Sequence, residues 1–153
     1  MSIIRIGLFG LGTVGCGICR IMALARNSHA EILKICVRDI NKKRPVEVPT
    51  GILTDRPEDI LENPDINLVV EVIDDPEASY RIVTTALRRG LPVVSGNKAM
   101  IARHLPELIE LQRKHGAALL YDASSCGSIP VIRNLEEYYD NDLLLEVKGI
   151  LNG

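Results

Sequence analysis

The sequence has few aromatic residues, no long apolar run and little net charge. It contains no tryptophan, one phenylalanine and four tyrosines, and its formal net charge is −2. A nucleic-acid-binding surface is usually basic, so the charge argues against that class of partner. No apolar run approaches the roughly 20 residues that span a membrane, and the first residues lack the pattern of a secretory signal. We therefore expect a soluble, cytoplasmic domain with no membrane or nucleic-acid partner.

Cysteine is also sparse, and Cys16, Cys19, Cys36 and Cys126 are spaced irregularly. Cys16 and Cys19 form a C-x-x-C pair, which at a helix start could serve redox chemistry. A zinc site would need further ligands at paired spacing. The cysteines fall where a predicted helix and strand should be buried, and free cysteine is commonly a small core residue. We predict that they pack in the core of one domain.

A glycine motif near the N-terminus organises the chain. An apolar run over residues 4–9, which predicts a buried strand, is followed by Gly10-x-Gly12-x-x-Gly15 and then by a helical pattern. In this context Gly10 permits a tight turn, Gly12 lets the backbone approach a pyrophosphate, and Gly15 lets the helix pack against the strand. The N-terminus of the helix attracts phosphates. We favour a dinucleotide site over a glycine-rich turn without a ligand.

Strand and helix patterns alternate along the chain. The predicted strands cover residues 4–9, 31–37, 67–73, 92–95, 117–121 and 143–150. The predicted helices cover residues 13–26, 57–61, 76–90, 106–115 and 130–139, and residues 41–51 form a loop. The first helix is expected to bury a stripe of Val14, Ile18, Ile21, Met22 and Ala25. This alternation predicts an α/β fold with a doubly wound, mostly parallel sheet and helices on both faces.

Polar residues follow four of the predicted strands, at 38–39, 74–75, 95–98 and 122–128. Ligands of a doubly wound sheet bind at the carboxyl ends of its strands, so we expect these residues to converge on one crevice.

The residues after the second strand bear on the choice of cofactor. Asp39 suits a ribose 2′-hydroxyl, whereas Arg38 suits a 2′-phosphate. Basic residues at 42–44 add positive charge nearby, although they could equally be a solvated loop. We favour NADP(H) over NAD.

Lys98 could stabilise negative charge that develops on a substrate oxygen. The alternative is a solvated lysine at a helix start, where its charge opposes the helix dipole.

Several motifs occur together in one order: Gly10-Leu11-Gly12-Thr13-Val14-Gly15, Val37-Arg38-Asp39, Gly96-Asn97-Lys98-Ala99, Tyr121-Asp122-Ala123-Ser124, Ile129-Pro130-Val131-Ile132 and Gly149-Ile150-Leu151-Asn152-Gly153. In this combination essentially the whole chain resembles the N-terminal nucleotide-binding domain of homoserine dehydrogenases. The resemblance implies a Rossmann-type fold and NAD or NADP as cofactor. It also implies reduction of aspartate semialdehyde to homoserine, on the route to threonine and methionine.

The resemblance further implies a domain organisation. Residues 1–153 would form the dinucleotide-binding domain, and a substrate domain with the principal proton donor would follow residue 153. The chain alone would then be inactive, and the full-length protein would be a homo-oligomer.

The resemblance also implies roles for individual residues at the positions that match the family. Lys98 matches a catalytic position, and the cofactor-binding positions are Gly10, Gly12, Thr13, Val14, Gly15, Arg38, Asp39, Ser95 and Lys98. A sodium site would use Asp122, Ser125, Gly127 and Ile129. The alternative for that loop is a strand-to-helix turn without an ion.

The chain departs from the family pattern at four places. Asp74-Asp75 replaces a glycine pair, and Ser95-Gly96 replaces Thr-Ala. Asp122 replaces a glutamate, and Ser125-Cys126 replaces Val-Gly. The aspartate pair puts negative charge beside the expected crevice. Two rival interpretations are another small-substrate dehydrogenase and a stand-alone, non-catalytic cofactor-binding module.

Overall fold

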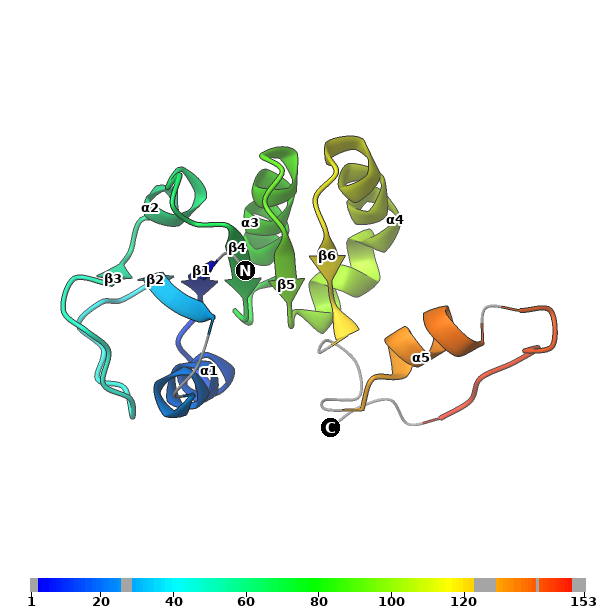
Figure 1. The fold of residues 1–153 in the computed structure, drawn as a ribbon, viewed down its shortest axis with the longest axis horizontal. Helices are drawn as coiled ribbons and strands as arrows, with labels where there is room; N and C mark the ends of the chain where they lie inside the picture. The colour runs from blue at the N-terminus through cyan, green and yellow to red at the C-terminus, as the bar shows by residue number, and fades with distance from the viewer. Residues whose placement is uncertain (1–2, 26–28, 123–128, 140, 150–153) are drawn as a thin grey trace.

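Six parallel strands form one sheet in the part of the chain that the computed structural model describes, residues 3–25, 29–122, 129–139 and 141–149 (Figure 1). The strands are β1 Ile4–Phe9, β2 Ala30–Cys36, β3 Leu53–Thr54, β4 Leu68–Glu71, β5 Val93–Ser95 and β6 Leu119–Leu120. They lie in the order β3-β2-β1-β4-β5-β6. The chain therefore winds from β1 to one edge and then from β4 to the other, which confirms the predicted Rossmann-type sheet.

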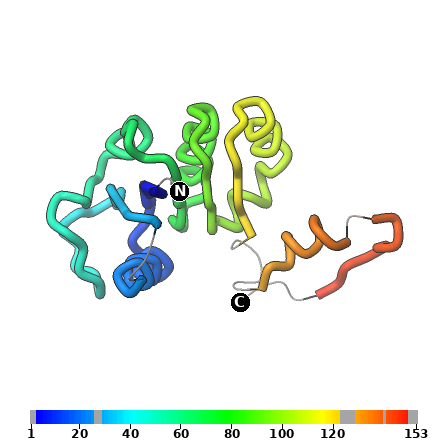
Figure 2. The backbone as a smooth tube through the Cα atoms, in the orientation of Figure 1, coloured from blue at the N-terminus to red at the C-terminus, as the bar shows by residue number. Residues whose placement is uncertain are grey.

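Helices cover both faces of this sheet. They are α1 Thr13–Leu24, α2 Glu58–Leu61, α3 Pro76–Arg88, α4 Lys98–His115 and α5 Val131–Tyr138. Figure 1 shows α1 on one side of the sheet and α2, α3 and α4 on the other. In the backbone trace of Figure 2, the segment that contains α5 extends to one side of β6. None of the helices in the described residues is long and apolar enough to cross a membrane.

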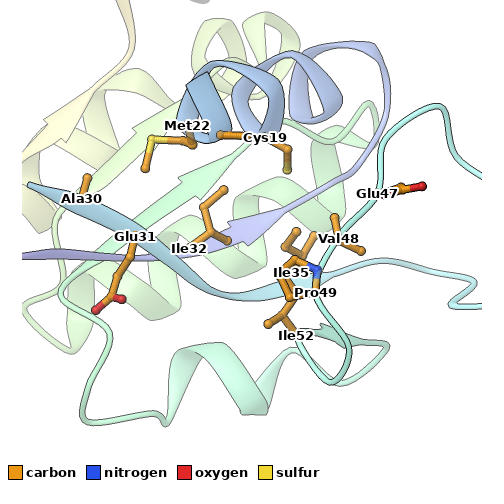
Figure 3. A pocket seen from close by; sticks show the side chains of 11 residues that line it. Cys19, Met22, Ala30, Glu31, Ile32, Ile35, Glu47, Val48, Pro49 and Ile52 are labelled. Carbon is orange, nitrogen blue, oxygen red and sulfur yellow. The ribbon is translucent and has the colours of Figure 1, made fainter. Parts of the chain in front are cut away.

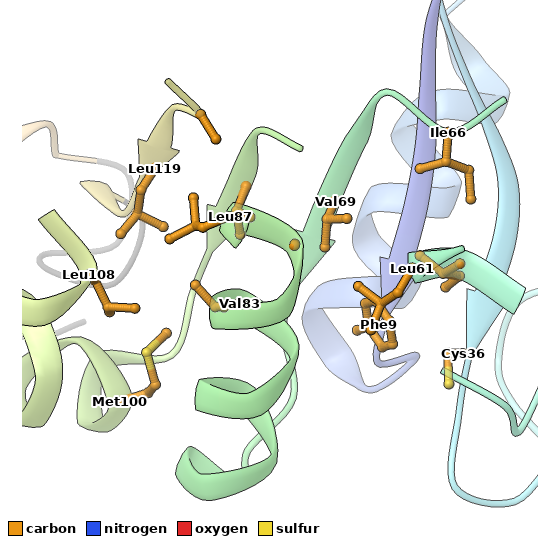
Figure 4. Packing of buried hydrophobic residues seen from close by; sticks show 14 of the residues in the cluster. Phe9, Cys36, Leu61, Ile66, Val69, Val83, Leu87, Met100, Leu108 and Leu119 are labelled. Atoms are coloured by element: carbon orange, nitrogen blue, oxygen red, sulfur yellow. The ribbon is translucent and has the colours of Figure 1, made fainter. Parts of the chain in front are cut away.

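Two apolar clusters, one on each face of the sheet, form the core. Successive strand residues point to opposite faces, so Phe9 and Val69 join one cluster while Leu8 and Val70 join the other. The first cluster lies under α2, α3 and α4, and Figure 4 labels its members Phe9, Cys36, Leu61, Ile66, Val69, Val83, Leu87, Met100, Leu108 and Leu119. The second lies under α1. Burial of both faces is typical of parallel sheets.

The cysteines in the described residues are part of this core. Cys16, Cys19 and Cys36 are buried free thiols, as predicted, and Cys126 lies outside the described residues. Burial raises the pKa of Cys19, and it raises the pKa of Cys36 to about 11. Because the thiolate is the reactive form, Cys19 and Cys36 are poor nucleophiles at neutral pH.

The helix signals around α3 are confirmed. The Asp75 side chain accepts hydrogen bonds of 3.0 Å from the backbone N–H groups of Glu77 and Ala78, and Pro76 is the first helical residue. The bond from Ala78 is the main cause that lowers the pKa of Asp75. Gly90 follows the helix with a φ of 75°. This left-handed conformation favours glycine and ends the helix.

The predicted start of the fourth helix is wrong. It begins at Lys98 rather than at residue 106, so Pro106 lies inside α4. Asn97 caps this earlier start, because its Oδ1 accepts the Met100 N–H at 3.0 Å. Burial of Met100 and Leu108 on one face outweighs the hydrogen bond that Pro106 cannot donate.

The predicted strand over residues 143–150 is wrong in the residues that the structure describes. Residues 143–149 form no strand, and the side chains of Leu143 and Leu145 are 90% and 92% exposed. An apolar run becomes a strand only where a neighbouring strand pairs with it. The short strand β3 is absent from the predicted strands. Its two residues extend the sheet beyond β2, and no pattern in the sequence indicates them.

The apolar stripe predicted for the first helix is wrong in part. Val14 and Ile21 are 59% and 68% exposed, whereas Gly15, Cys16 and Cys19 are the buried residues of α1. Small residues face the sheet because the helix lies close to β1. In α5 the apolar face expected at Val131, Ile132, Leu135, Tyr138 and Tyr139 includes no buried residue.

We predict that Leu108→Ala lowers the free energy of unfolding by about 2–5 kcal/mol, because it removes a fully buried side chain and leaves a cavity. Leu24→Ala is the control, since Leu24 is 80% exposed and its loss should cost less than about 0.5 kcal/mol. Urea denaturation followed by circular dichroism measures both. Equal losses would show that Leu108 is not in the core.

Candidate functional site

The carboxyl ends of four neighbouring strands lie in one row. Phe9 at the end of β1 pairs with Cys36 of β2 and with Glu71 of β4, and Glu71 pairs with Ser95 of β5. The segments that follow these strands therefore leave the same edge of the sheet. They bring together the glycine loop, Arg38–Asp39, Asp74–Asp75 and Lys98, as the sequence predicts.

The glycine loop after β1 is built for close approach. Gly10 has a φ of 98°, and a Cβ there would lie 3.0 Å from the Val72 carbonyl oxygen. A Cβ on Gly15 would overlap the Gly10 carbonyl oxygen, so α1 packs against the loop only with glycine at that position. A Cβ on Gly12 would meet no atom within 4 Å. Packing within the chain therefore does not require a glycine at position 12, and this residue borders open space.

The N-terminus of α1 faces this open space. Its first backbone bond runs from the Cys16 N–H to the Gly12 carbonyl at 2.9 Å, so the N–H groups of Thr13, Val14 and Gly15 precede the intrahelical ladder. Gly12 provides no side-chain cap, and the first turn contains no acidic residue. Free N–H groups and the positive end of a helix dipole form a site for an anion such as a pyrophosphate.

Arg38 stands at one side of this anion site. Its guanidinium donates a 2.9 Å hydrogen bond to Oδ1 of Asp74, and both side chains are exposed. The Asp39 side chain turns instead to its own loop, where Oδ1 accepts the Asn41 N–H at 2.8 Å. The exposed guanidinium of Arg38 is therefore a candidate to contact a phosphate.

A buried carboxylate, which sequence reasoning missed, lies behind the site. Glu71 has no exposed surface. Its Oε2 accepts hydrogen bonds from the hydroxyls of Ser79 and of Ser95, the latter at 2.6 Å, and its Oε1 accepts the Ile73 N–H at 2.8 Å. Burial raises the pKa of Glu71, and the three hydrogen bonds partly oppose that rise. The sequence feature that could have indicated Glu71 is a single glutamate inside an otherwise apolar run.

The hydrogen-bond network of Glu71 continues to Asn97, the residue before Lys98. The Ser95 hydroxyl oxygen accepts the Asn97 N–H at 3.2 Å, and the Asn97 side-chain amide donates to the Ile73 carbonyl at 3.1 Å. These contacts hold Lys98 as the first residue of α4, with its side chain exposed at the site edge. The Ser95 side chain is fully buried and is already bonded to Glu71.

The glycine loop and the strand ends match one known family. The family model described as "Homoserine dehydrogenase, NAD binding domain" matches residues 10–122. This chain belongs to that family.

Relatives of the homoserine dehydrogenase family cover the whole chain. It is 36% identical to the homoserine dehydrogenase of Bacillus subtilis in an alignment of 160 residues that covers all of this chain and 37% of the relative. The crystal structure of a homoserine dehydrogenase from Thiobacillus denitrificans superimposes with a TM-score of 0.77 and 31% identity, over 88% of this chain and 32% of that one. The chain thus spans about a third of the length of these relatives. These matches do not favour either rival interpretation.

A more distant family member shares the fold. The hyperthermophilic archaeal homoserine dehydrogenase in complex with NADPH superimposes with a TM-score of 0.72 over 88% of this chain and 48% of that one. At 24% identity this likeness concerns the fold alone.

The sodium site that the family resemblance suggests stays a prediction. Oδ1 of Asp122 accepts the Arg133 N–H of α5 at 3.2 Å, and Ile129 is 61% exposed. Ser125 and Gly127 lie outside the described residues. Among the described residues, no group of three or more His, Cys, Asp or Glu side chains is placed to hold a metal ion.

A cavity of about 290 Å³ lies away from the strand ends (Figure 3). Residues of α1, of β2 and of the segment 47–52 line it. Most of these side chains are apolar, and the two charged ones, Glu31 and Glu47, are acidic. An anionic dinucleotide fits this lining poorly.

We predict that Gly12→Val weakens NADPH binding without unfolding the chain, because the new side chain would fill the space over the α1 N-terminus. Affinity should fall at least about tenfold, or about 1.4 kcal/mol. Gly17→Ala is the control, since a Cβ on Gly17 also meets no atom within 4 Å. Calorimetry measures binding, and circular dichroism checks the fold. Equal affinity in Gly12→Val and the parent would refute the site.

We also predict that Glu71→Gln changes how stability depends on pH. Because the pKa of Glu71 is raised in the folded state, the folded chain binds a proton more tightly than the unfolded chain. The contribution of Glu71 to the free energy of unfolding is therefore fully present below the ordinary glutamate pKa of about 4.3. It is lost as the pH rises through the pKa that Glu71 has in the folded state. Relative to Glu71→Gln, the parent should lose thermal stability as the pH rises above the ordinary glutamate pKa. A difference in Tm that does not change with pH would contradict this.

Proposed function

We propose that this chain binds NAD(P)H along the carboxyl edge of its sheet and forms the cofactor-binding part of a homoserine dehydrogenase. The observation that carries the proposal is the open α1 N-terminus beside Gly12, where a pyrophosphate would meet the N–H groups of Thr13, Val14 and Gly15. Membership of the family supports the same cofactor class.

The 2′ position of the adenosine ribose would lie near the end of β2. Arg38 would meet a 2′-phosphate there, and charged hydrogen bonds to phosphate are strong. Asp39 would instead suit a 2′-hydroxyl, but its Oδ1 already accepts the Asn41 N–H. We therefore propose that the site accepts NADP(H) as well as NAD(H).

The reaction that fits the family is reduction of aspartate semialdehyde to homoserine. The bound nicotinamide would supply the hydride. Lys98 stands at the end of β5, next to the buried network, and its ammonium would stabilise negative charge on the aldehyde oxygen. Ser95 would shape the turn before Lys98 rather than contact the cofactor, because its hydroxyl bonds Glu71.

A second domain would complete the reaction. Aspartate semialdehyde has a carboxylate, an ammonium and an aldehyde, and each needs a partner. In this chain Lys98 is the residue that we assign to catalysis, and the relatives have about two thirds of their length beyond the matched part. The proton donor, the substrate pocket, the homo-oligomer contacts and the sodium ion at Asp122 are further parts of this proposal.

We predict that the 153-residue chain alone does not oxidise NADPH with aspartate semialdehyde above background. Joined to the remaining part of the Bacillus subtilis relative, it should turn over. In that chimera Lys98→Ala should lower kcat by about 10²-fold, as loss of one group that stabilises an oxyanion does.

Lys114→Ala is the matched control, because Lys114 lies in the last turn of the same helix, away from the strand ends. It should leave kcat unchanged. Robust turnover by the short chain would refute the two-domain proposal, and equal activity of Lys98→Ala and Lys114→Ala would refute the role of Lys98.

A further inference from the structure

The Arg38–Asp74 ion pair crosses the carboxyl end of β1. Arg38 follows β2 and Asp74 follows β4, and β1 lies between these strands in the sheet. Nη2 of Arg38 lies 2.9 Å from Oδ1 of Asp74. A dinucleotide that extends from the α1 N-terminus toward the end of β2 must therefore pass beside this pair.

The ion pair is open to exchange of partners. The side chains of Arg38 and Asp74 are 82% and 89% exposed, and exposed ion pairs contribute little to stability. The neighbouring Arg44 is engaged elsewhere, since it donates to the backbone carbonyls of Lys42 and Asp39. Arg38 can therefore turn from the carboxylate to an arriving phosphate, and the two anions then compete for its guanidinium.

We propose that Asp74 is a specificity-determining residue that lowers the preference of this site for NADPH over NADH. This inference rests on the proposed function. A 2′-phosphate has about −1.5 to −2 charges, as other phosphate monoesters do, and it competes with the Asp74 carboxylate for Arg38 and is repelled by it. A 2′-hydroxyl is uncharged and leaves the pair intact. The carboxylate therefore weakens NADPH binding selectively.

Asp75 offers a matched control for the charge of Asp74. It is the next residue and has the same charge, but its Oδ1 caps α3 by accepting the N–H groups of Glu77 and Ala78. Asparagine caps a helix about as well as aspartate. Asp75→Asn therefore removes a negative charge from the same segment while the cap is kept and the Arg38–Asp74 contact stays.

The test is a set of dissociation constants for NADPH and NADH, measured by cofactor fluorescence at low ionic strength on the 153-residue chain and its variants. Asp74→Asn should raise the ratio of NADPH to NADH affinity about two- to fivefold. Asp74→Gly, which removes the whole side chain, should act in the same direction. Asp75→Asn should change the ratio less, and the effect of Asp74→Asn should be smaller in an Arg38→Ala background, where repulsion by the carboxylate remains but competition for Arg38 is absent.

Three results would overturn the inference: an unchanged ratio in both Asp74 variants, an equal effect of Asp75→Asn, or an effect of Asp74→Asn that is equally large without Arg38. Thermal melts confirm that each variant is folded, as expected for substitutions of an exposed side chain. Failure of the parent chain to bind either cofactor would instead refute the proposed function, and the inference with it.

Discussion

The buried carboxylate of Glu71 connects the elements that present the site. It accepts hydrogen bonds from Ile73 after its own strand, from Ser79 in α3 and from Ser95 at the end of β5. Asn97, the cap of α4, donates to Ser95 in turn. A buried polar group that loses its partner costs about 1–3 kcal/mol, so the turn before Lys98 depends on this one side chain.

Much of the fold could be predicted from the sequence, because its signals are local. The glycine motif, the Asp75–Pro76 helix start and the buried cysteines follow from backbone conformation and side-chain size. The secondary-structure predictions are wrong where contacts with residues distant in the sequence determine the local structure. Pro106 is accommodated because α4 buries Leu108, and residues 143–149 form no strand because no strand pairs with them in the described structure.

The positions of the site residues could also be predicted from the sequence, but their contacts could not. Parallel strands place Arg38, Asp74 and Lys98 at one edge, as expected. Their pairing was not predictable, because the Arg38–Asp74 contact requires β1 to lie between β2 and β4. Ser95 was assigned to the cofactor by its position after a strand, but its hydroxyl turns inward, since Glu71 is an acceptor that only the folded structure brings near.

Pro106 has a consequence for how α4 opens. Because proline has no N–H, the carbonyl of Ala102 loses its partner four residues later, and the backbone ladder is interrupted in the middle of the helix. Amide hydrogen exchange would then record two units with separate opening free energies. Both units pack against the sheet through fully buried side chains, Met100 in the first and Leu108 in the second.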